Sequence, residues 1–258
     1  MSDKEFLELI EHLDFDHFKN IAKKLDKNED EIYIRSYLCL LEFTEYVTGE
    51  SHLDMKTSIP ALAHMVYGWM PTMLDQVDYK KVDSEISKDL INRVKSDNNL
   101  SDKDISCIKA VTNNSIVGAS KLLHFLNPKK YPIFDSRVVV GIARLAKMYT
   151  GIEEKDVEVL NIVSPTNLSQ KIEWYKKYRE KLQKIIDEKK DVFGELKKKL
   201  RNEHYLIDNA SDMRTLEVCL FAAGIGIPKK QKEENEKDKK ANEKRAKIIN
   251  QLRAIFKP

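Results

Sequence analysis

The sequence is poor in residues that interrupt helices and in residues that build metal centres. Its 258 residues include only 8 glycines, 7 prolines, 3 cysteines and 2 tryptophans. Three scattered cysteines cannot form a four-cysteine metal or iron–sulfur site. We expect them to be small buried apolar residues in a reducing, cytoplasmic protein. No apolar run is long enough to span a bilayer, and residues 1–5 lack the basic start of a signal peptide. We therefore expect a protein with no metal, no cofactor and no membrane partner.

The small net charge of +3 conceals a difference between the two parts of the chain. Residues 1–104 carry 13 Lys and Arg against 22 Asp and Glu, a balance of −9. Residues 105–258 carry 32 against 20, a balance of +12. A chain that separates charge in this way often presents its basic part to a polyanion, although soluble helical proteins also carry lysine-rich faces.

Apolar residues recur mostly at steps of three and four, which predicts an all-α fold. Ser101 and Asp104 have the spacing of a capping box and predict a helix start. We expect an N-terminal helical lobe over 1–104, a second lobe over 105–228 with a cleft between the two, and a charged helix or tail over 229–258. The predicted helices cover residues 32–47, 61–70 (between Pro60 and Pro71), 82–96, 115–126, 136–149, 167–200 and 213–223.

The most informative segment is residues 115–138, SIVGASKLLHFLNPKKYPIFDSRV. It predicts an apolar helix, a basic loop stiffened by two prolines, and an aspartate, Asp135, at the start of the next helix. A carboxylate there can be an N-cap or a reacting group, because both use the free N–H groups of a first turn. Three aromatic residues, Phe125, Tyr131 and Phe134, crowd the loop more than a cap requires.

Residues 129–138, KKYPIFDSRV, resemble the aspartate loop of helix-hairpin-helix DNA glycosylases, above all the adenine-mismatch branch. The longer segment 119–138 resembles a bacterial group described as similar to 8-oxoguanine DNA glycosylases. Residues 212–224, DMRTLEVCLFAAG, are similar to the C-terminal helix of that group. The resemblance covers about 110–120 residues, and the rest of the chain shares only helical character with the family.

The resemblance implies that Asp135 stands beside the sugar of an everted nucleotide. There it would stabilise the oxocarbenium ion that forms as the base departs, or orient a water against C1′. Some members add a lysine that attacks C1′ and forms a Schiff base. Lys121 is the only lysine in the apolar stretch before Asp135, but the family position, counted back without a gap, falls near Val117. We expect water to complete the reaction while Lys121 pairs with a phosphate or with Asp135, and the Schiff-base route stays open.

The family hairpin normally carries two glycines whose N–H groups bind a DNA phosphate. Here Asn113 and Asn114 precede Gly118, and asparagine tolerates the left-handed conformation better than most residues. The resemblance thus implies a phosphate-binding hairpin at these positions. Other candidates for contacts with DNA or with the everted base lie in two regions. The first holds the aromatic and histidine side chains His64, Tyr67 and Trp69. The second is the proline-containing loop and the helix ends beside it, with His124, Lys129, Lys130, Ser136 and Arg137.

Several of these residues also have a purely structural explanation. The aromatic stripe of residues 64–69 is typical of a core, and His124 is typical of a buried histidine with satisfied hydrogen bonds. Arg214 and Glu217 lie three residues apart, so we expect an ordinary pair on one helical face.

These features together predict a monomeric DNA glycosylase that acts on double-stranded DNA in the cytoplasm, associated with the nucleoid. Its substrate would be an oxidised purine, in DNA repair, or a hypermodified base of phage DNA, in antiviral defence. The alternative is a non-catalytic helical DNA-binding or protein-interaction module in which Asp135 is only an N-cap.

Overall fold

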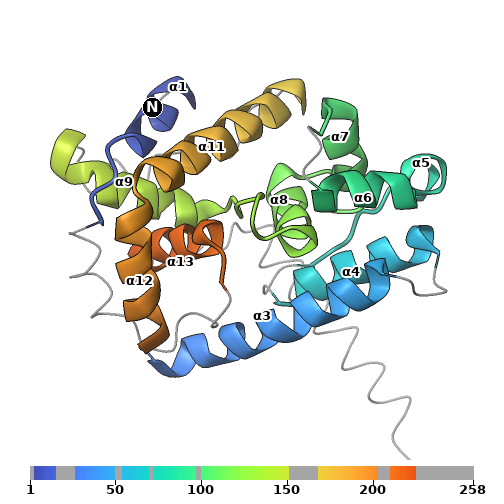
Figure 1. Ribbon diagram of the computed structural model, residues 1–258. Helices are drawn as coiled ribbons and strands as arrows, with labels where there is room; N and C mark the ends of the chain where they lie inside the picture. Colours follow the sequence, from blue (N-terminus) through green and yellow to red (C-terminus); the bar gives the residue numbers. More distant parts are fainter. Residues whose placement is uncertain are drawn as a thin grey trace, which may run out of the picture. The chain divides into compact units, whose positions relative to one another are not determined.

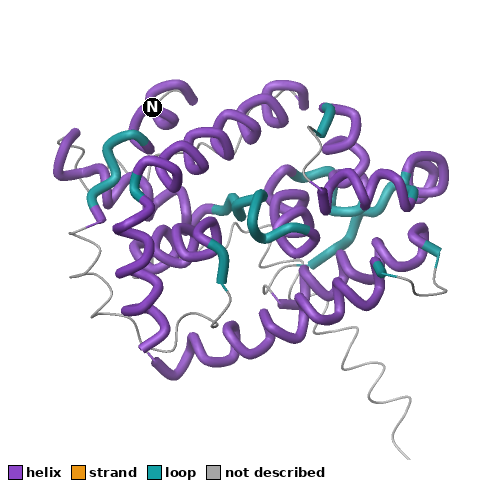
Figure 2. Tube along the Cα trace, viewed as in Figure 1, coloured by secondary structure: helices purple, strands orange, loops and turns teal. Residues whose placement is uncertain are grey.

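The computed structural model describes residues 3–15, 27–49, 54–69, 73–96, 100–150, 168–202 and 210–224, and every regular element in these ranges is an α-helix (Figures 1 and 2). The all-α prediction is therefore confirmed. None of these helices is long and apolar enough to cross a membrane. The helices are α1 (Asp3–Ile10), α3 (Lys27–Thr48), α4 (Met55–Trp69), α5 (Tyr79–Glu85), α6 (Lys88–Ser96), α7 (Asp102–Ala110), α8 (Ile116–Leu126), α9 (Ser136–Thr150), α11 (Leu168–Glu188), α12 (Lys190–Asn202) and α13 (Asp212–Gly224).

Helix α4 begins six residues earlier than the position of Pro60 predicts. The carbonyl of Asp54 accepts the N–H groups of Thr57 and Ser58, so the helix starts at Met55 and Pro60 lies inside it. Proline in a helix removes one backbone hydrogen bond. The helix continues because Met55, Ile59 and Pro60 itself are buried against the rest of the molecule, and this packing offsets the loss.

The single helix predicted over residues 82–96 is two helices. Ile86 has extended backbone (ψ 119°) and ends α5, while its side chain is buried. The Ser87 hydroxyl then accepts the N–H of Leu90 at 3.2 Å, which is the hydrogen bond of an N-cap. The serine therefore starts α6, and the prediction was wrong because it gave more weight to the apolar spacing than to this cap.

Helix α8 packs against five others, α3, α4, α6, α7 and α11 (Figure 1). Helix α1 packs against α9 and α11, although these lie far from it in the sequence. The helices of residues 3–224 belong to one compact unit. The division into lobes at residues 104 and 105 stays a prediction, and the segment 229–258 lies outside the described residues.

Two glycines allow α9 and α13 to touch backbone to backbone. A Cβ added to Gly141 would lie 1.8 Å from the carbonyl oxygen of Leu220, and one added to Gly224 would lie 2.0 Å from that of Arg137. Real Cβ atoms essentially never come this close to a backbone atom. The crossing therefore requires glycine at both positions, and it fixes the helix that follows Asp135.

All three cysteines are free thiols. Cys107 and Cys219 are buried, as expected, but Cys39 is exposed on α3, where the prediction of a buried residue was wrong. Burial, followed by the hydrogen bond and charge of Glu85, raises the pKa of the Cys107 thiol to about 12, so the thiol stays protonated.

Candidate functional site

A tight hairpin joins α7 to α8. Helix α7 begins with the predicted capping box of Ser101 and Asp104. Between the two helices, Asn113 (φ 54°) and Asn114 (φ 47°) both adopt the left-handed conformation, and Ser115 caps α8. Both asparagines therefore adopt the left-handed conformation that their residue type tolerates.

The side chain of Asn113 is fully used within the protein. Its Oδ1 accepts the N–H groups of Asp75 and Gln76 at 3.1 and 2.9 Å, and its Nδ2 donates to the carbonyl of Met73 at 2.9 Å. These bonds attach the segment after α4 to the hairpin. Asn114 is exposed. Asn113 and Ser115 are partly buried, so Asn114 is the most exposed of the three side chains.

Gly118 and Tyr67 serve the packing of the hairpin. The Tyr67 hydroxyl donates to the carbonyl of Thr112 at 3.0 Å and so ties α4 to the turn. A Cβ on Gly118 would lie 2.1 Å from that hydroxyl oxygen, so glycine makes room for the phenol. Both residues are buried, so the structure does not support their assignment to a surface that contacts DNA.

The loop between α8 and α9, residues 127–135, is anchored by the hydroxyl groups of two tyrosines of α11. The Tyr175 hydroxyl donates to the carbonyl of Pro132 at 2.9 Å, and the Tyr178 hydroxyl donates to that of Ile133 at 3.1 Å. Both tyrosines are buried, so water does not compete for these bonds. The backbone leading to Asp135 is therefore held in one place.

Phe134 completes this anchoring. Its N–H donates to the Ser120 hydroxyl at 3.0 Å, which ties the loop to α8. Its ring packs against Trp174 with centroids 4.6 Å apart, and against Tyr178 at 5.5 Å. The rings around Phe134 thus come from α11, and they were not among the three aromatic residues expected to crowd the loop.

Asp135 lies at the N-terminus of α9 and uses its two carboxylate oxygens differently. Oδ1 accepts the N–H of Val138 at 2.9 Å, which is the N-cap bond. Oδ2 lies 3.7 Å from the Nζ of Lys121, which projects from α8. The Asp135 side chain is 17% exposed and that of Lys121 is 7% exposed. The two catalytic candidates are thus brought together at the edge of the interior.

Burial lowers the pKa of Lys121, because the ammonium loses its hydration. The carboxylates of Asp135 and Glu217 attract the ammonium and work against this lowering, whereas Arg137 adds to it. Among the residues that the structure describes, no group of three His, Cys, Asp or Glu side chains is placed to hold a metal ion. The chemistry offered here is that of one carboxylate and one buried amine.

A cluster of buried polar side chains lies behind this pair. The Tyr37 hydroxyl and Nε2 of His124 are 2.8 Å apart, and Nδ1 of His124 lies 2.8 Å from the carbonyl oxygen of Tyr131. Arg214 donates to Oε1 of Glu217 at 2.6 Å and stacks 4.0 Å over the Tyr37 ring. His124 is completely buried, so we leave it out of the surface proposed to meet DNA.

The aromatic and histidine candidates of α4 differ in their exposure to solvent. His64 is exposed. Trp69 is half-buried and meets the Phe125 ring edge-on with centroids 5.2 Å apart, and the Tyr37 ring at 6.1 Å. Of this set, Trp69 alone combines an aromatic face with partial exposure and so stays the candidate for stacking on a base.

The basic candidates around the loop are at the surface. Lys129 and Lys130 are exposed in the turn after α8. Arg137 is exposed in the first turn of α9, with its guanidinium 5.0 Å over the Phe221 ring. Ser136 begins α9, but its side chain lies outside the described residues.

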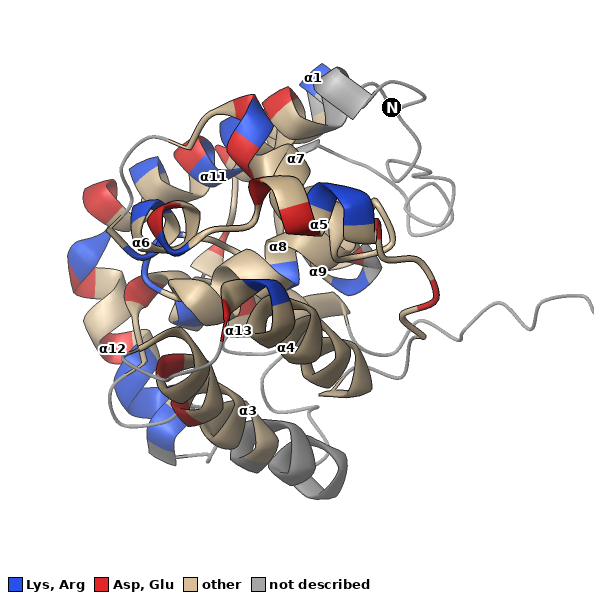
Figure 3. Cartoon of the chain, turned by 90° about the vertical axis from the view of Figure 1, so that its right-hand side faces the viewer, with Lys and Arg blue, Asp and Glu red and all other residues tan. Residues whose placement is uncertain are grey.

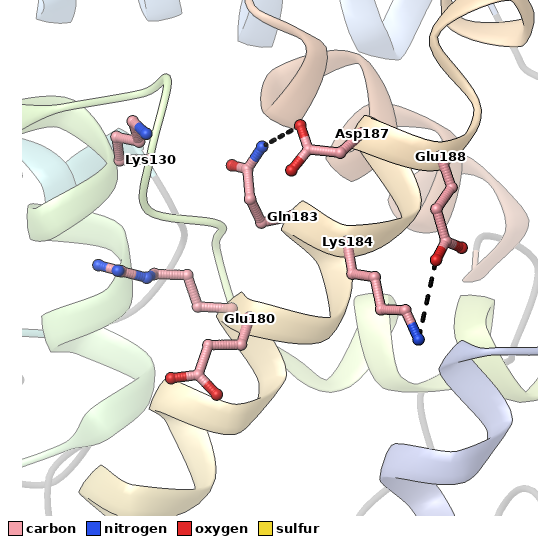
Figure 4. Close-up of a pocket in the computed structure, with 7 residues that line it drawn as sticks. Lys130, Glu180, Gln183, Lys184, Asp187 and Glu188 are labelled. Carbon is pink, nitrogen blue, oxygen red and sulfur yellow. Dashed lines mark hydrogen bonds and ion pairs between the residues drawn. The ribbon is translucent and has the colours of Figure 1, made fainter.

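Two pockets lie along α11. A pocket of about 450 Å³ is shown in Figure 4, and its side chains pair with one another, as Lys184 does with Glu188. Neither pocket is lined by Asp135 or Lys121. The first is lined by Lys130, Arg179, Glu180, Gln183, Lys184, Asp187 and Glu188. The second, of about 340 Å³, is lined by Leu100, Ser101, Ile105, Tyr131, Tyr175, Lys176, Arg179 and Glu180.

The charged residues of α11 and α12 include both signs (Figure 3). Several form ion pairs, including Lys197 with Asp212 at 2.7 Å. The basic excess of residues 105–258 therefore does not by itself mark one binding face. The exposed Lys129, Lys130 and Arg137 near Asp135 are the cations placed closest in sequence to the candidate site.

Sequence reasoning did not connect Tyr37 or Glu217 with the site. Tyr37 is 87 residues from His124 in the sequence, and no local pattern announces their contact. Glu217 was assigned only to its pair with Arg214, which the structure confirms. The one available signal was an acidic residue inside an otherwise apolar helix.

No protein-family model, curated protein or solved structure matches the chain. Its function therefore has to be inferred from the placement of its own residues.

Proposed function

We propose that the protein is a DNA glycosylase that turns a damaged or modified nucleotide out of duplex DNA and cleaves its N-glycosidic bond with Asp135. The observation that carries the proposal is the divided use of the carboxylate, with Oδ1 capping α9 and Oδ2 facing a buried lysine 3.7 Å away. A cap needs one oxygen and no ammonium partner. Keeping a lysine and an aspartate together in a nearly dry place costs hydration energy, which favours a chemical role.

The proposed reaction needs negative charge beside C1′ as the bond to the base breaks. Oδ2 of Asp135 would stabilise the positive charge that develops on the sugar, or orient a water that attacks C1′. Its position is held by the N-cap bond and by the anchored loop, so little reorganisation is needed. Lys121 in its charged form attracts the Asp135 carboxylate across 3.7 Å and can also approach a DNA phosphate.

The hairpin and the start of α8 support binding to the DNA backbone. A helix start leaves N–H groups without intrahelical partners, and these groups bind phosphate oxygens. The left-handed turn at Asn113 and Asn114 leads directly into Ser115, which caps α8. Exposed Lys129, Lys130 and Arg137 would add charge to this surface.

The substrate class rests on the resemblance of residues 119–138, which implies an oxidised purine. A hypermodified base of phage DNA is the second candidate, and it would make the protein a defence enzyme instead of a repair enzyme. Trp69 is the proposed stacking partner of the everted base.

The test is incubation with duplex oligonucleotides that carry a panel of oxidised and hypermodified bases, followed by alkaline cleavage at abasic sites. Asp135→Asn preserves the size of the side chain and much of its capping, but removes the charge. We expect base release to fall by about a hundredfold or more, as for other groups that stabilise a transition state electrostatically. Asp78→Asn is the matched control, because Asp78 caps α5 through the N–H of Lys81 at 3.1 Å. An Asp135→Asn variant as active as the wild type would exclude the proposed role.

The alternative is a non-catalytic DNA-binding or protein-interaction module. It is favoured by the hydrogen bond from Val138, because capping α9 is by itself a sufficient structural role for Asp135. It predicts that the wild-type protein releases no base from any duplex. It also predicts that Asp135→Asn and Asp78→Asn lower thermal stability by similar amounts and change nothing else.

A further inference from the structure

Three successive carbonyls in the loop before Asp135 each accept a hydrogen bond from a buried side chain. Tyr175 and Tyr178 of α11 donate to two of them, as described above. The first carbonyl, that of Tyr131, lies 2.8 Å from Nδ1 of His124, a completely buried residue of α8. The residue after Tyr131 is a proline, which has no N–H to donate. This part of the loop is therefore held through its carbonyls, and His124 holds the first of them.

The surroundings of His124 determine which of its nitrogens carries the hydrogen. The Tyr131 carbonyl can only accept, so Nδ1 donates to it. Oε2 of Glu217, which has no hydrogen-bond donor among the described residues, lies 3.5 Å from the same nitrogen, and its negative charge favours a hydrogen there. Complete burial lowers the pKa of His124, so the ring is neutral. Nε2 therefore accepts from the Tyr37 hydroxyl at 2.8 Å.

The imidazole of His124 cannot turn over without breaking buried hydrogen bonds. Tyr37 is itself held, because the Arg214 guanidinium stacks 4.0 Å over its ring and donates to Oε1 of Glu217 at 2.6 Å. A half turn of the imidazole would place carbon atoms opposite the Tyr131 carbonyl and the Tyr37 hydroxyl. Both buried groups would then be unpaired, which is costly. The surrounding residues thus maintain the one orientation in which His124 binds the loop.

We infer that His124 is a positioning residue, whose Nδ1 hydrogen holds the Tyr131 carbonyl and so keeps Asp135 in place at the start of α9. This inference rests on the proposed glycosylase function, and it gives His124 a role within the protein, without contact with DNA. Tyr131 precedes Asp135 by four residues, so release of its carbonyl would let the loop and the carboxylate shift together. A displacement of about 1 Å can lower a reaction rate by about a hundredfold.

Two substitutions separate the hydrogen bond to the loop from the presence of the ring. The side-chain amide of His124→Asn ends where Nδ1 was, so it can still donate to Tyr131 but no longer reaches Tyr37. The amide of His124→Gln ends where Nε2 was, so it can still reach Tyr37 but no longer donates to Tyr131. His124→Asn leaves the larger cavity, so a role in packing alone predicts that it is the more damaging of the two. The inference predicts the opposite order.

The first measurement needs no DNA. The N–H of Val138 donates to Oδ1 of Asp135 at 2.9 Å, so its hydrogen exchange, followed by NMR, reports whether the carboxylate is in place. Exchange at Val138 should be several-fold faster in His124→Gln than in His124→Asn, which should stay close to the wild type. The Asp104 amide, bound in the same way to the Ser101 hydroxyl at 3.2 Å, is the reference for a general loss of stability. Exchange that is equal in the two variants relative to this reference, or faster in His124→Asn, would overturn the inference.

The second measurement is base release from the most active duplex of the panel described above. His124→Gln should lower kcat by about tenfold or more with little change in KM, because the surface that meets DNA is unaltered. Tyr37→Phe removes only the bond to Nε2 and should keep most of the activity, as should His124→Asn. His64→Gln, at the exposed histidine of α4, should behave as the wild type.

A His124→Gln enzyme with the wild-type kcat would also overturn the inference. A different result would refute the proposed function alone. In that case no duplex loses its base, but exchange at Val138 follows the expected order, and the action of His124 on Asp135 stands.

Discussion

Gly141→Ala should destabilise the protein because α9 and α13 touch at this position without space for a methyl group. The new Cβ would lie 1.8 Å from the Leu220 oxygen, so the helices would have to separate by about 1.6 Å to restore an ordinary contact of 3.4 Å. Overpacking costs about 1–3 kcal/mol, and backbone against backbone belongs at the upper end. Alanine returns about 1 kcal/mol of helix propensity, which leaves a net loss of about 2 kcal/mol. For a domain of this size, the melting temperature should fall by about 4–8 °C.

Gly194 on α12 provides the matched control, because a Cβ added there meets nothing within 4 Å. Gly194→Ala should gain about 1 kcal/mol from helix propensity alone. Thermal unfolding followed by far-UV circular dichroism compares both variants with the wild type. If Gly141→Ala melts at or above the wild-type temperature, the described backbone contact between α9 and α13 is incorrect. Since α9 follows directly after Asp135, a confirmed loss should also reduce base release.

Three further outcomes are expected. Asn114→Ala should lower the free energy of unfolding by about 1 kcal/mol, because alanine resists the left-handed conformation, whereas Asn114→Gly should not; urea unfolding distinguishes them. The pKa of buried His124 lies below its ordinary value of 6.5, so below that pH the unfolded chain binds a proton that the folded chain excludes. The stability present above this pH is therefore lost as the pH falls, and the loss should be smaller in His124→Gln. Binding to undamaged duplex should weaken steeply with rising salt, as measured by fluorescence anisotropy. Binding that does not change with salt would favour the protein-interaction module.

Local patterns predicted the parts of the structure that depend on neighbouring residues. The capping box at Ser101 and the position of Asp135 before α9 each follow from a few adjacent side chains. The left-handed turn at Asn113 and Asn114 could be predicted for the same reason, since the tolerance of asparagine for positive φ is a property of the residue itself.

The contacts that complete the candidate site depend on tertiary packing and could not be predicted in this way. Tyr175 and Tyr178 lie in the stretch predicted as helical over 167–200, and no local pattern indicates that their hydroxyl groups reach carbonyls more than 40 residues away. The proximity of Lys121 to Asp135 was one of the alternatives considered, and the fold brings the two within 3.7 Å. Pro60 shows the opposite case, in which tertiary burial overrides a strong local signal.

The asparagine pair at the hairpin has a consequence for finding related proteins. A search pattern that demands glycine at both left-handed positions would pass over this turn, because asparagine occupies both positions here. A pattern that accepts glycine or asparagine there, followed by a serine cap and then an aspartate after a proline-containing loop, would retain it. Such a pattern describes the shape of the backbone instead of one residue type, and it could gather chains whose kinship is hidden by substitution at the turn.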